Sequence, residues 1–182
     1  SVRRRASRTV LDLLFHRLTT WLAPVLVFTM EDVWLDRFPG DESSVHLQDF
    51  PETPPSWANA DLAAKWAKIR AARRVVTGAL ELRRQEKEIG ASLEAAPLLQ
   101  LTDPELAAAV RSVDMAEICI TSGIEIQVGE PQADAFRLED PAIGVVFQRA
   151  DGPKCQRCWR FLPDVGTHAH PGTCQRCNDA LG

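Results

Sequence analysis

The chain has 182 residues, 45% of them hydrophobic, and a formal net charge of -4 at pH 7. This composition is ordinary for a globular protein, and no apolar run approaches the roughly 20 residues of a membrane-spanning helix, so we expect no membrane span. The charge is uneven, because residues 61–88 carry eight Lys or Arg against four acids. The first twenty residues carry five arginines against Asp12 alone: Arg3, Arg4, Arg5, Arg8 and Arg17. Two basic stretches on an acidic protein favour a local surface for a polyanion, although solvated helix faces would give the same pattern.

The beginning of the chain predicts two helices. Apolar residues recur at three- and four-residue intervals over residues 3–23, which predicts an amphipathic helix that Pro24 ends or kinks. Thr29, with Asp32 three residues later, resembles a capping box and predicts the start of a short second helix. The side chains that this second helix is expected to bury are Val33 and Trp34.

Residues 38–57 are rich in proline and predict a long connection, which is typical of functional loops or crossovers rather than tight turns. Three apolar residues are expected to hold this connection against the helices: Val45, Leu47 and Phe50. Residues 61–89 then predict the longest helix, with Gly90 as its C-terminal cap. One face of this helix is apolar and is expected to pack on the first helices, while the other face carries an arginine-rich surface.

The period of the pattern changes after Gly90. The expected strands are residues 92–101, 117–121, 124–128 and 143–148, and a short helix is expected from Asp103 to about Arg111. A strand, a helix and further strands in this order are typical of a small α/β unit. Cys119 lies in the second expected strand, and a lone cysteine among apolar residues is more often a small core residue than a nucleophile.

The end of the chain contains two Cys-x-x-Cys pairs, separated by fifteen residues. They are Cys155-Gln156-Arg157-Cys158 and Cys174-Gln175-Arg176-Cys177. This spacing is typical of a four-cysteine zinc site, because a two-residue gap lets both sulfurs of a pair bind one tetrahedral metal. Residues 151–182 are also too few to fold on apolar burial alone. The sequence therefore predicts one structural zinc, whose four thiolate ligands leave no open position for a substrate.

Disulfides and redox chemistry are the competing roles for the cysteine pairs. Two disulfides would need an oxidising compartment, and the sequence shows no secretory signal peptide, so we expect a cytoplasmic protein. A redox enzyme would need a thioredoxin-like βαβ context around the pairs, which the pattern does not show. His168 and His170 lie between the pairs and could each replace a cysteine, but with four thiolates present we expect them to be loop residues.

Four stretches of the chain resemble bacterial isoleucyl-tRNA synthetases, a family of class I enzymes. The first is Trp21-Leu22-Ala23-Pro24-Val25-Leu26 with Phe28-Thr29 and Glu31-Asp32-Val33-Trp34, and the second is Ser44-Val45-His46-Leu47 with Phe50-Pro51. The third runs from Arg70 through Arg83 to Ile89-Gly90-Ala91-Ser92-Leu93-Glu94-Ala95, and the fourth comprises the two cysteine pairs with Trp159. A similar zinc module closes the formamidopyrimidine-DNA glycosylases, so the zinc motif alone would not choose a tRNA over a DNA partner.

The resemblance implies a multidomain α+β fold. Its expected parts are a helical-bundle anticodon-binding domain at residues 1–90, a small α/β unit at residues 91–150 and a four-cysteine zinc module at residues 151–182. The ligands implied for the zinc are Cys155, Cys158, Cys174 and Cys177. The two cysteine pairs favour resemblance to the isoleucine enzymes over the valine enzymes, because the valine enzymes typically end in a coiled coil. No residue is expected to be catalytic, because nothing resembles the His-Ile-Gly-His or Lys-Met-Ser-Lys-Ser segments that bind ATP in class I enzymes.

The function implied by the resemblance is tRNA binding at the anticodon, within an enzyme that charges tRNA with isoleucine using ATP. The residues expected to contact tRNA are Trp159, Arg157, Arg160, Phe161, Arg70 and Arg74, with Trp159 as a stacking platform. Trp159 could instead cover the zinc or pack on the α/β unit, and Arg157 and Arg176 could merely orient the thiolates. The alternative function is a zinc-stabilised docking module without RNA contact. The expected partners are isoleucine-accepting tRNA and the catalytic and editing domains of the same chain, and the protein is expected to be a monomer.

Overall fold

The computed structural model describes residues 2–140 and 142–182, and the side chain of Arg3, part of the first basic stretch, lies outside the described residues. The chain divides into two compact units, residues 1–58 and residues 59–182. The first unit is helical, and the second combines helices with a three-stranded sheet, so the predicted α+β fold class is confirmed. No helix within the described residues is both long and apolar enough to cross a membrane. The functional boundaries expected at residues 90 and 150 stay predictions.

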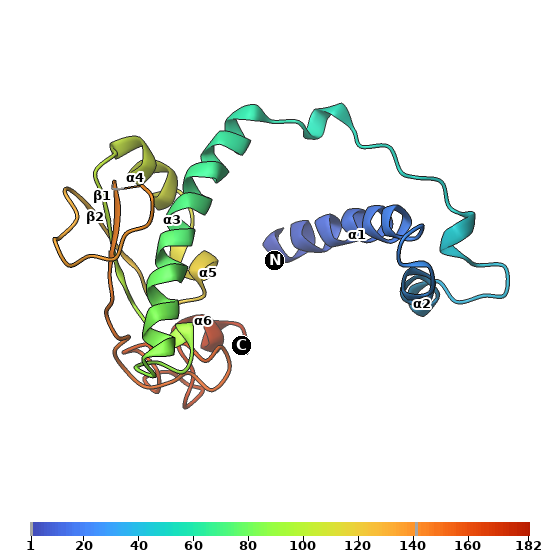
Figure 1. The fold of residues 1–182 in the computed structure, drawn as a ribbon. Helices are drawn as coiled ribbons and strands as arrows, with labels where there is room; N and C mark the ends of the chain where they lie inside the picture. The colour runs from blue at the N-terminus through green and yellow to red at the C-terminus, as the bar shows by residue number, and fades with distance from the viewer. Residues whose placement is uncertain (1, 141) are drawn as a thin grey trace. The chain divides into compact units, whose positions relative to one another are not determined.

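Helices α1 (Val2–Leu22) and α2 (Val27–Arg37) form the first unit, and α1 ends before Pro24 as predicted (Figure 1). An aromatic cluster joins the two helices. The ring centroid of Phe15 on α1 lies 6.2 Å from that of Trp34 on α2, and Trp34 lies 4.8 Å from Phe38. Because aromatic rings bury a large apolar area each, this cluster is the core of the unit.

The predicted capping box at Thr29 is wrong. Helix α2 begins two residues earlier, at Val27, and no side chain caps it. The chain turns directly from α1 into α2 instead, with the Leu26 amide donating to the Leu22 carbonyl at 2.8 Å. Trp34 is buried as predicted, but Val33 is 39% exposed, because it is the preceding residue along the helix and lies about 100° around it.

Residues 38–57 form the predicted long connection, which contains two short 3₁₀ turns, η1 (Val45–Leu47) and η2 (Pro55–Trp57). Val45 is buried as predicted, whereas Leu47 and Phe50 are 74% and 61% exposed, so the prediction that they hold the connection is wrong. Polar contacts hold it instead. The Glu31 carboxylate accepts hydrogen bonds from the Val45 amide and the Ser44 hydroxyl, and the buried Arg17 donates to the Glu52 carbonyl at 2.8 Å.

Helix α3 (Ala60–Gln85) opens the second unit, and the Asn59 side chain caps its start by accepting a hydrogen bond from the Leu62 amide. Its apolar face is buried at Ile69, Ala72, Val76 and Leu80, within the core of the second unit, so the prediction that this face packs on the first helices is wrong. The helix ends four residues earlier than predicted, because Lys87 takes the left-handed conformation (φ 59°) that was expected of Gly90. The Gly90 amide instead donates to the Glu94 carboxylate at 3.1 Å.

Strands β1 (Leu98–Leu101), β2 (Glu125–Val128) and β3 (Ile143–Val146) form one sheet in the order β2-β1-β3. The central strand β1 runs parallel to β2 and antiparallel to β3, and all four of its residues are buried. The first predicted strand was too long at its start, since residues 92–94 form the 3₁₀ turn η3 (Ser92–Glu94). Helices α3 and α4 pack on the sheet and complete the core.

Helix α4 (Pro104–Arg111) is the predicted short helix, capped by the Asp103 side chain. The strand predicted at residues 117–121 is wrong, because helix α5 (Met115–Cys119) occupies this stretch. The Asp114 carboxylate caps α5 by accepting from the Glu117 amide, and Ile120 ends it in the left-handed conformation (φ 58°). Cys119 is a core residue as predicted, with 3% exposure, and burial raises the pKa of its thiol to about 12.

Residues 151–182 form an irregular segment of the second unit with one short helix, α6 (Gln175–Asp179) (Figure 1). Their buried core is small and consists mainly of the cysteine side chains.

Candidate metal centre and nucleic-acid interface

The two cysteine pairs meet in one cluster. The Sγ atoms of Cys155, Cys158, Cys174 and Cys177 all lie within 4.8 Å of one another, and three of these side chains are buried. The Cys158 and Cys174 sulfurs are 3.7 Å apart. Four thiolates at about 2.3 Å from a tetrahedral zinc would be about 3.8 Å apart, whereas a disulfide needs about 2.05 Å. The sulfurs therefore fit one zinc and are free of disulfides.

Backbone hydrogen bonds shape each pair into a tight knuckle. In the first knuckle the Trp159 amide donates to the Cys155 carbonyl at 2.9 Å, and the Cys155 amide donates to the Arg160 carbonyl at 2.8 Å. In the second knuckle the Cys177 amide donates to the Cys174 carbonyl at 2.9 Å. The Cys174 amide also donates to the Cys155 sulfur, at 3.4 Å, so the second pair supports the first directly.

Two glycines allow the segment to close on itself. Gly152 has a φ of 93°, and a Cβ atom there would lie 2.4 Å from the Leu162 carbonyl carbon. Gly172 has a φ of 77°, and its carbonyl accepts a hydrogen bond from the Gln156 amide at 2.9 Å. A Cβ atom at position 172 would lie 2.7 Å from the Gln156 side chain. A side chain would strain the backbone at both positions, and at position 152 it would also collide with the backbone of Leu162 and Pro163.

The thiols differ in their electrostatic surroundings. Burial raises the pKa of Cys174 to about 12. Burial also acts to raise the pKa of Cys155, but hydrogen bonds from neighbouring backbone amides outweigh it and lower this pKa to about 6. Cys155 therefore loses its proton more readily than Cys174, from which a metal must displace a proton.

The loop between the pairs is fixed by Asp164. Its Oδ2 atom accepts a hydrogen bond from the Gln175 amide at 2.7 Å and lies 3.1 Å from His168 Nε2. These contacts, with the Gln175 amide as the largest, hold the pKa of the Asp164 carboxyl below its usual value. His168 and His170 lie outside the cysteine cluster, as predicted: His168 contacts Asp164, and His170 Nε2 lies 3.2 Å from the Gly182 carbonyl.

Trp159 stands out of the first knuckle. Trp159 follows Cys158 directly in the sequence. Its side chain is 60% exposed, and its backbone φ is 65°. A bulky residue with positive φ is a backbone outlier that persists only where the surroundings fix it, and such outliers cluster at functional sites. The Lys154 ammonium lies 5.8 Å from the ring centroid.

The other residues expected to contact tRNA fall into two groups. Arg157 on the knuckle and Arg70 and Arg74 on α3 are exposed, and within the described part of the chain none of the three forms an ion pair. Arg160 and Phe161 are half-buried, and the Arg160 Nε atom is buried without a hydrogen-bond partner. The structure thus presents the first group to a ligand and places the second group partly inside the protein.

Ser122 joins the zinc segment to the rest of its unit. Its side chain is 3% exposed, its hydroxyl donates to the Leu93 carbonyl, and the same oxygen accepts a hydrogen bond from the Phe161 amide at 2.7 Å. Arg176 lies 4.0 Å from Glu117 on α5 and adds a weaker contact between the two parts. The position of Trp159, two residues before Phe161, therefore depends on a buried serine outside the zinc segment.

We expect Ser122→Ala to destabilise the second unit by about 1 to 3 kcal/mol, because it leaves the Phe161 amide and the Leu93 carbonyl without a partner. Chemical denaturation with zinc bound would measure this change. Ser112→Ala is the matched control: its hydroxyl is exposed, so its effect should stay within about 0.5 kcal/mol. Equal effects of the two variants would contradict the bridging role of Ser122.

Ser122 and Lys154 were not among the residues predicted from the sequence. Lys154 immediately precedes Cys155, and a basic residue beside a knuckle tryptophan could have been noticed as a further charge at the same surface. Ser122 gave no signal, because its partners Leu93 and Phe161 lie 29 and 39 residues away in the sequence.

Two known families match this chain. The family described as "anticodon-binding domain of tRNA ligase" matches residues 1–99, and the family described as "zinc finger found in FPG and IleRS" matches residues 152–180. The second match covers the cysteine cluster, and together they assign one structural zinc to the chain.

Curated relatives match along almost the whole chain. The isoleucine–tRNA ligase of Ruegeria pomeroyi is 60% identical over 183 residues, which cover 100% of this chain and 19% of the relative. The isoleucine–tRNA ligases of Agrobacterium fabrum and Bartonella henselae are 55% and 51% identical, and each alignment covers 92% of this chain and 17% of the relative. The chain thus spans less than a fifth of the length of these relatives. By its helical first half, its cysteine cluster and these matches, the chain belongs to the anticodon-binding domain family of tRNA ligases, in the form found in isoleucine–tRNA ligases.

Proposed function

We propose that this chain is the tRNA-binding, anticodon-recognising region of an isoleucine–tRNA ligase. The observation that carries the proposal is Trp159, an exposed indole held at positive φ on a metal-stapled knuckle and flanked by Lys154 and Arg157. Proteins read single-stranded RNA loops by stacking unpaired bases on aromatic rings and arginine planes, and an anticodon loop presents such bases. The exposed Trp159 ring, flanked by the cationic side chains of Lys154 and Arg157, is suited to stacking on an unpaired base.

Each part of the chain has a role in this proposal. The zinc, held by Cys155, Cys158, Cys174 and Cys177, folds the module at residues 151–182. Trp159 stacks on a base, and Arg157 and Lys154 neutralise nearby phosphates. Arg70 and Arg74, in the helical domain proposed at residues 1–90, contact the phosphates of the anticodon stem, and residues 91–150 connect the two.

The full-length protein in this proposal charges isoleucine-accepting tRNA with isoleucine, using ATP bound by catalytic domains of the same polypeptide. Editing domains of that polypeptide are its other expected partners. We propose a cytoplasmic monomer. The residues of this chain supply tRNA binding, and none of them is assigned to the chemical step.

The test is electrophoretic binding of isoleucine tRNA and of the same tRNA with a mutated anticodon, with zinc measured in the same protein sample. We expect tighter binding of the native anticodon, and an affinity that falls steeply with salt because phosphate contacts release counterions. Equal binding of the two tRNAs by zinc-loaded protein would contradict anticodon recognition, and a flat salt response would contradict the phosphate contacts.

The second candidate function is a docking module that holds the zinc segment on the enzyme without touching RNA. The hydrogen bond between Phe161 and Ser122 and the half-burial of Arg160 favour it. A Cys155→Ser variant separates the two functions, because it should lose zinc and the knuckle. Docking alone predicts a less stable protein with unchanged tRNA affinity, whereas anticodon recognition predicts that the affinity falls.

A further inference from the structure

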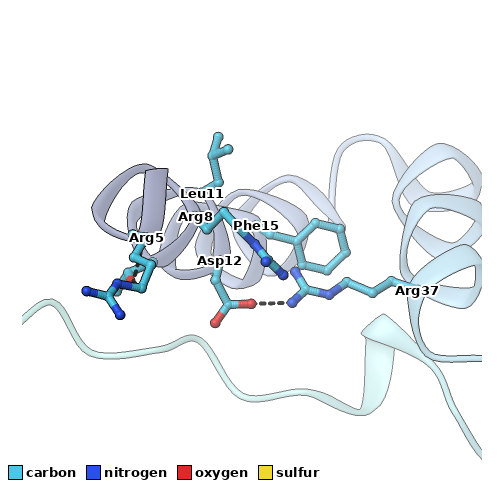
Figure 2. Close-up of a pocket in the computed structure, with 7 residues that line it drawn as sticks. Arg5, Arg8, Leu11, Asp12, Phe15 and Arg37 are labelled. Atoms are coloured by element: carbon cyan, nitrogen blue, oxygen red, sulfur yellow. Dashed lines mark hydrogen bonds and ion pairs between the residues drawn. The ribbon is translucent and has the colours of Figure 1, made fainter. Parts of the chain in front are cut away.

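A basic cleft lies between α1 and the end of α2 in the first unit, about 730 Å³ in volume and open to solvent. Its lining residues are Arg5, Arg8, Thr9, Leu11, Asp12, Phe15 and Arg37. Among the described residues that line the cleft, three carry guanidinium groups and one carries a carboxylate. Figure 2 shows Asp12 between Arg5 and Arg37, with the side chains of Arg8 and Arg37 ending beside the Phe15 ring.

Arg37 is held in place before any ligand arrives. It forms an ion pair and hydrogen bond with Asp12, and its guanidinium carbon lies 4.5 Å from the Phe15 ring centroid and 5.1 Å from that of Phe38. The hydrogen bond from Arg37 keeps the pKa of the Asp12 carboxyl below its usual value, so this carboxylate is ionised at neutral pH. A guanidinium fixed in this way loses little conformational entropy when it binds an anion.

Arg5 and Arg8 provide charge that Asp12 does not neutralise. Within the described residues, neither guanidinium has an ion-pair partner, and the one carboxylate of the cleft is already bound to Arg37. The three arginines and Asp12 leave a charge of +2 in a chain whose total is -4. Like charges gathered in one cleft repel each other, and an anion with several acceptor oxygens removes that repulsion. The planar guanidinium fork matches a phosphate in particular.

We propose that this cleft is a phosphate-binding site for the RNA backbone, with Arg8 and Arg37 as its central donors and Arg5 at its edge. The inference rests on the proposed function, since tRNA is the polyanion that the protein would meet. The competing occupant is a carboxylate from another part of the full-length polypeptide. RNA is favoured because two unpaired guanidinium groups beside a third suit a chain of phosphates better than a single carboxylate.

The test compares the full-length protein with its Arg8→Ala and Arg5→Ala/Arg8→Ala variants, by isoleucine tRNA affinity at several salt concentrations. We expect about a tenfold loss of affinity for Arg8→Ala, the strength of one charged hydrogen bond. The slope of log affinity against log salt should fall by about 0.7 to 0.9 for each phosphate contact removed. Arg8→Lys should keep the slope. Arg84→Ala is the matched control, because Arg84 is an exposed arginine paired with Glu81 at 3.0 Å on another helix.

The outcomes separate the occupants of the cleft. If Arg8→Ala changes neither affinity nor slope while Trp159→Ala weakens tRNA binding, the cleft is not an RNA site and the proposed function stands. If neither variant changes tRNA binding, both ideas fail. If Arg8→Ala lowers the unfolding temperature of the free protein without changing the salt slope, the cleft holds a carboxylate of the polypeptide, and the inference is overturned.

Discussion

Removal of the zinc should unfold residues 151–182 and leave the helices and sheet of residues 59–150 folded. Apart from the cysteines, the apolar core of the zinc segment consists of Val165 with Leu162 packed against it. Burying two such side chains contributes only a few kcal/mol, while ordering each residue of the backbone costs about 1 to 2 kcal/mol. A structural zinc contributes about 10 to 16 kcal/mol, so the metal dominates the stability of this segment.

Hydrogen exchange after chelation would measure this effect segment by segment, and a Cys174→Ser variant should give the same pattern without a chelator. Cys119→Ala is the matched control, because Cys119 is buried in the core of the unit and lies outside the cysteine cluster. It should keep its zinc while losing some stability. Full protection of residues 151–182 in metal-free protein would show that the segment folds by apolar packing alone, contrary to this prediction.

Trp159→Ala should lower the affinity for isoleucine tRNA about five- to 150-fold, because the stacking of one base contributes about 1 to 3 kcal/mol. The ring is 60% exposed, so its removal should leave the zinc and the fold in place. Trp159→Phe should keep most of the affinity, since a smaller ring still stacks. The measurement is a tRNA titration of each variant, with the zinc content determined in parallel.

Leu181→Ala is the control for Trp159→Ala, because Leu181 is an apolar residue of the same segment with 50% exposure. Its removal should not change tRNA binding. A Trp159→Ala protein that holds its zinc and binds tRNA as tightly as the unmodified protein would refute stacking. The exposed ring would then have a role other than RNA binding.

Local patterns predicted much of this structure. The two-residue gap within each cysteine pair indicated the four-sulfur cluster, because such a gap brings both sulfurs to one metal. The helical period of apolar residues placed α1, α3 and α4 within a few residues of their observed bounds. These features depend on residues close in the sequence, which is why the sequence could indicate them.

The features that the sequence did not predict depend on single backbone conformations or on distant partners. Ile118 and Ile120 alternate as in a strand, yet the Asp114 cap and the left-handed conformation of Ile120 make this stretch a short helix. Arg157 and Arg160 looked alike as RNA-binding residues, but the knuckle exposes the first and half-buries the second. The Ser122 hydroxyl connects the backbones of Leu93 and Phe161, which lie far from it in the sequence, so no local pattern indicates these hydrogen bonds.

Trp159 is the residue through which we propose that the zinc module reads the anticodon. A double-mutant cycle tests this role, with unmodified and Trp159→Ala full-length proteins each binding isoleucine tRNA and its anticodon mutant, and with zinc content verified in all samples. We expect the unmodified protein to prefer the native anticodon and the Trp159→Ala protein to lose most of this preference. An undiminished preference in the zinc-loaded Trp159→Ala protein would contradict the proposed role.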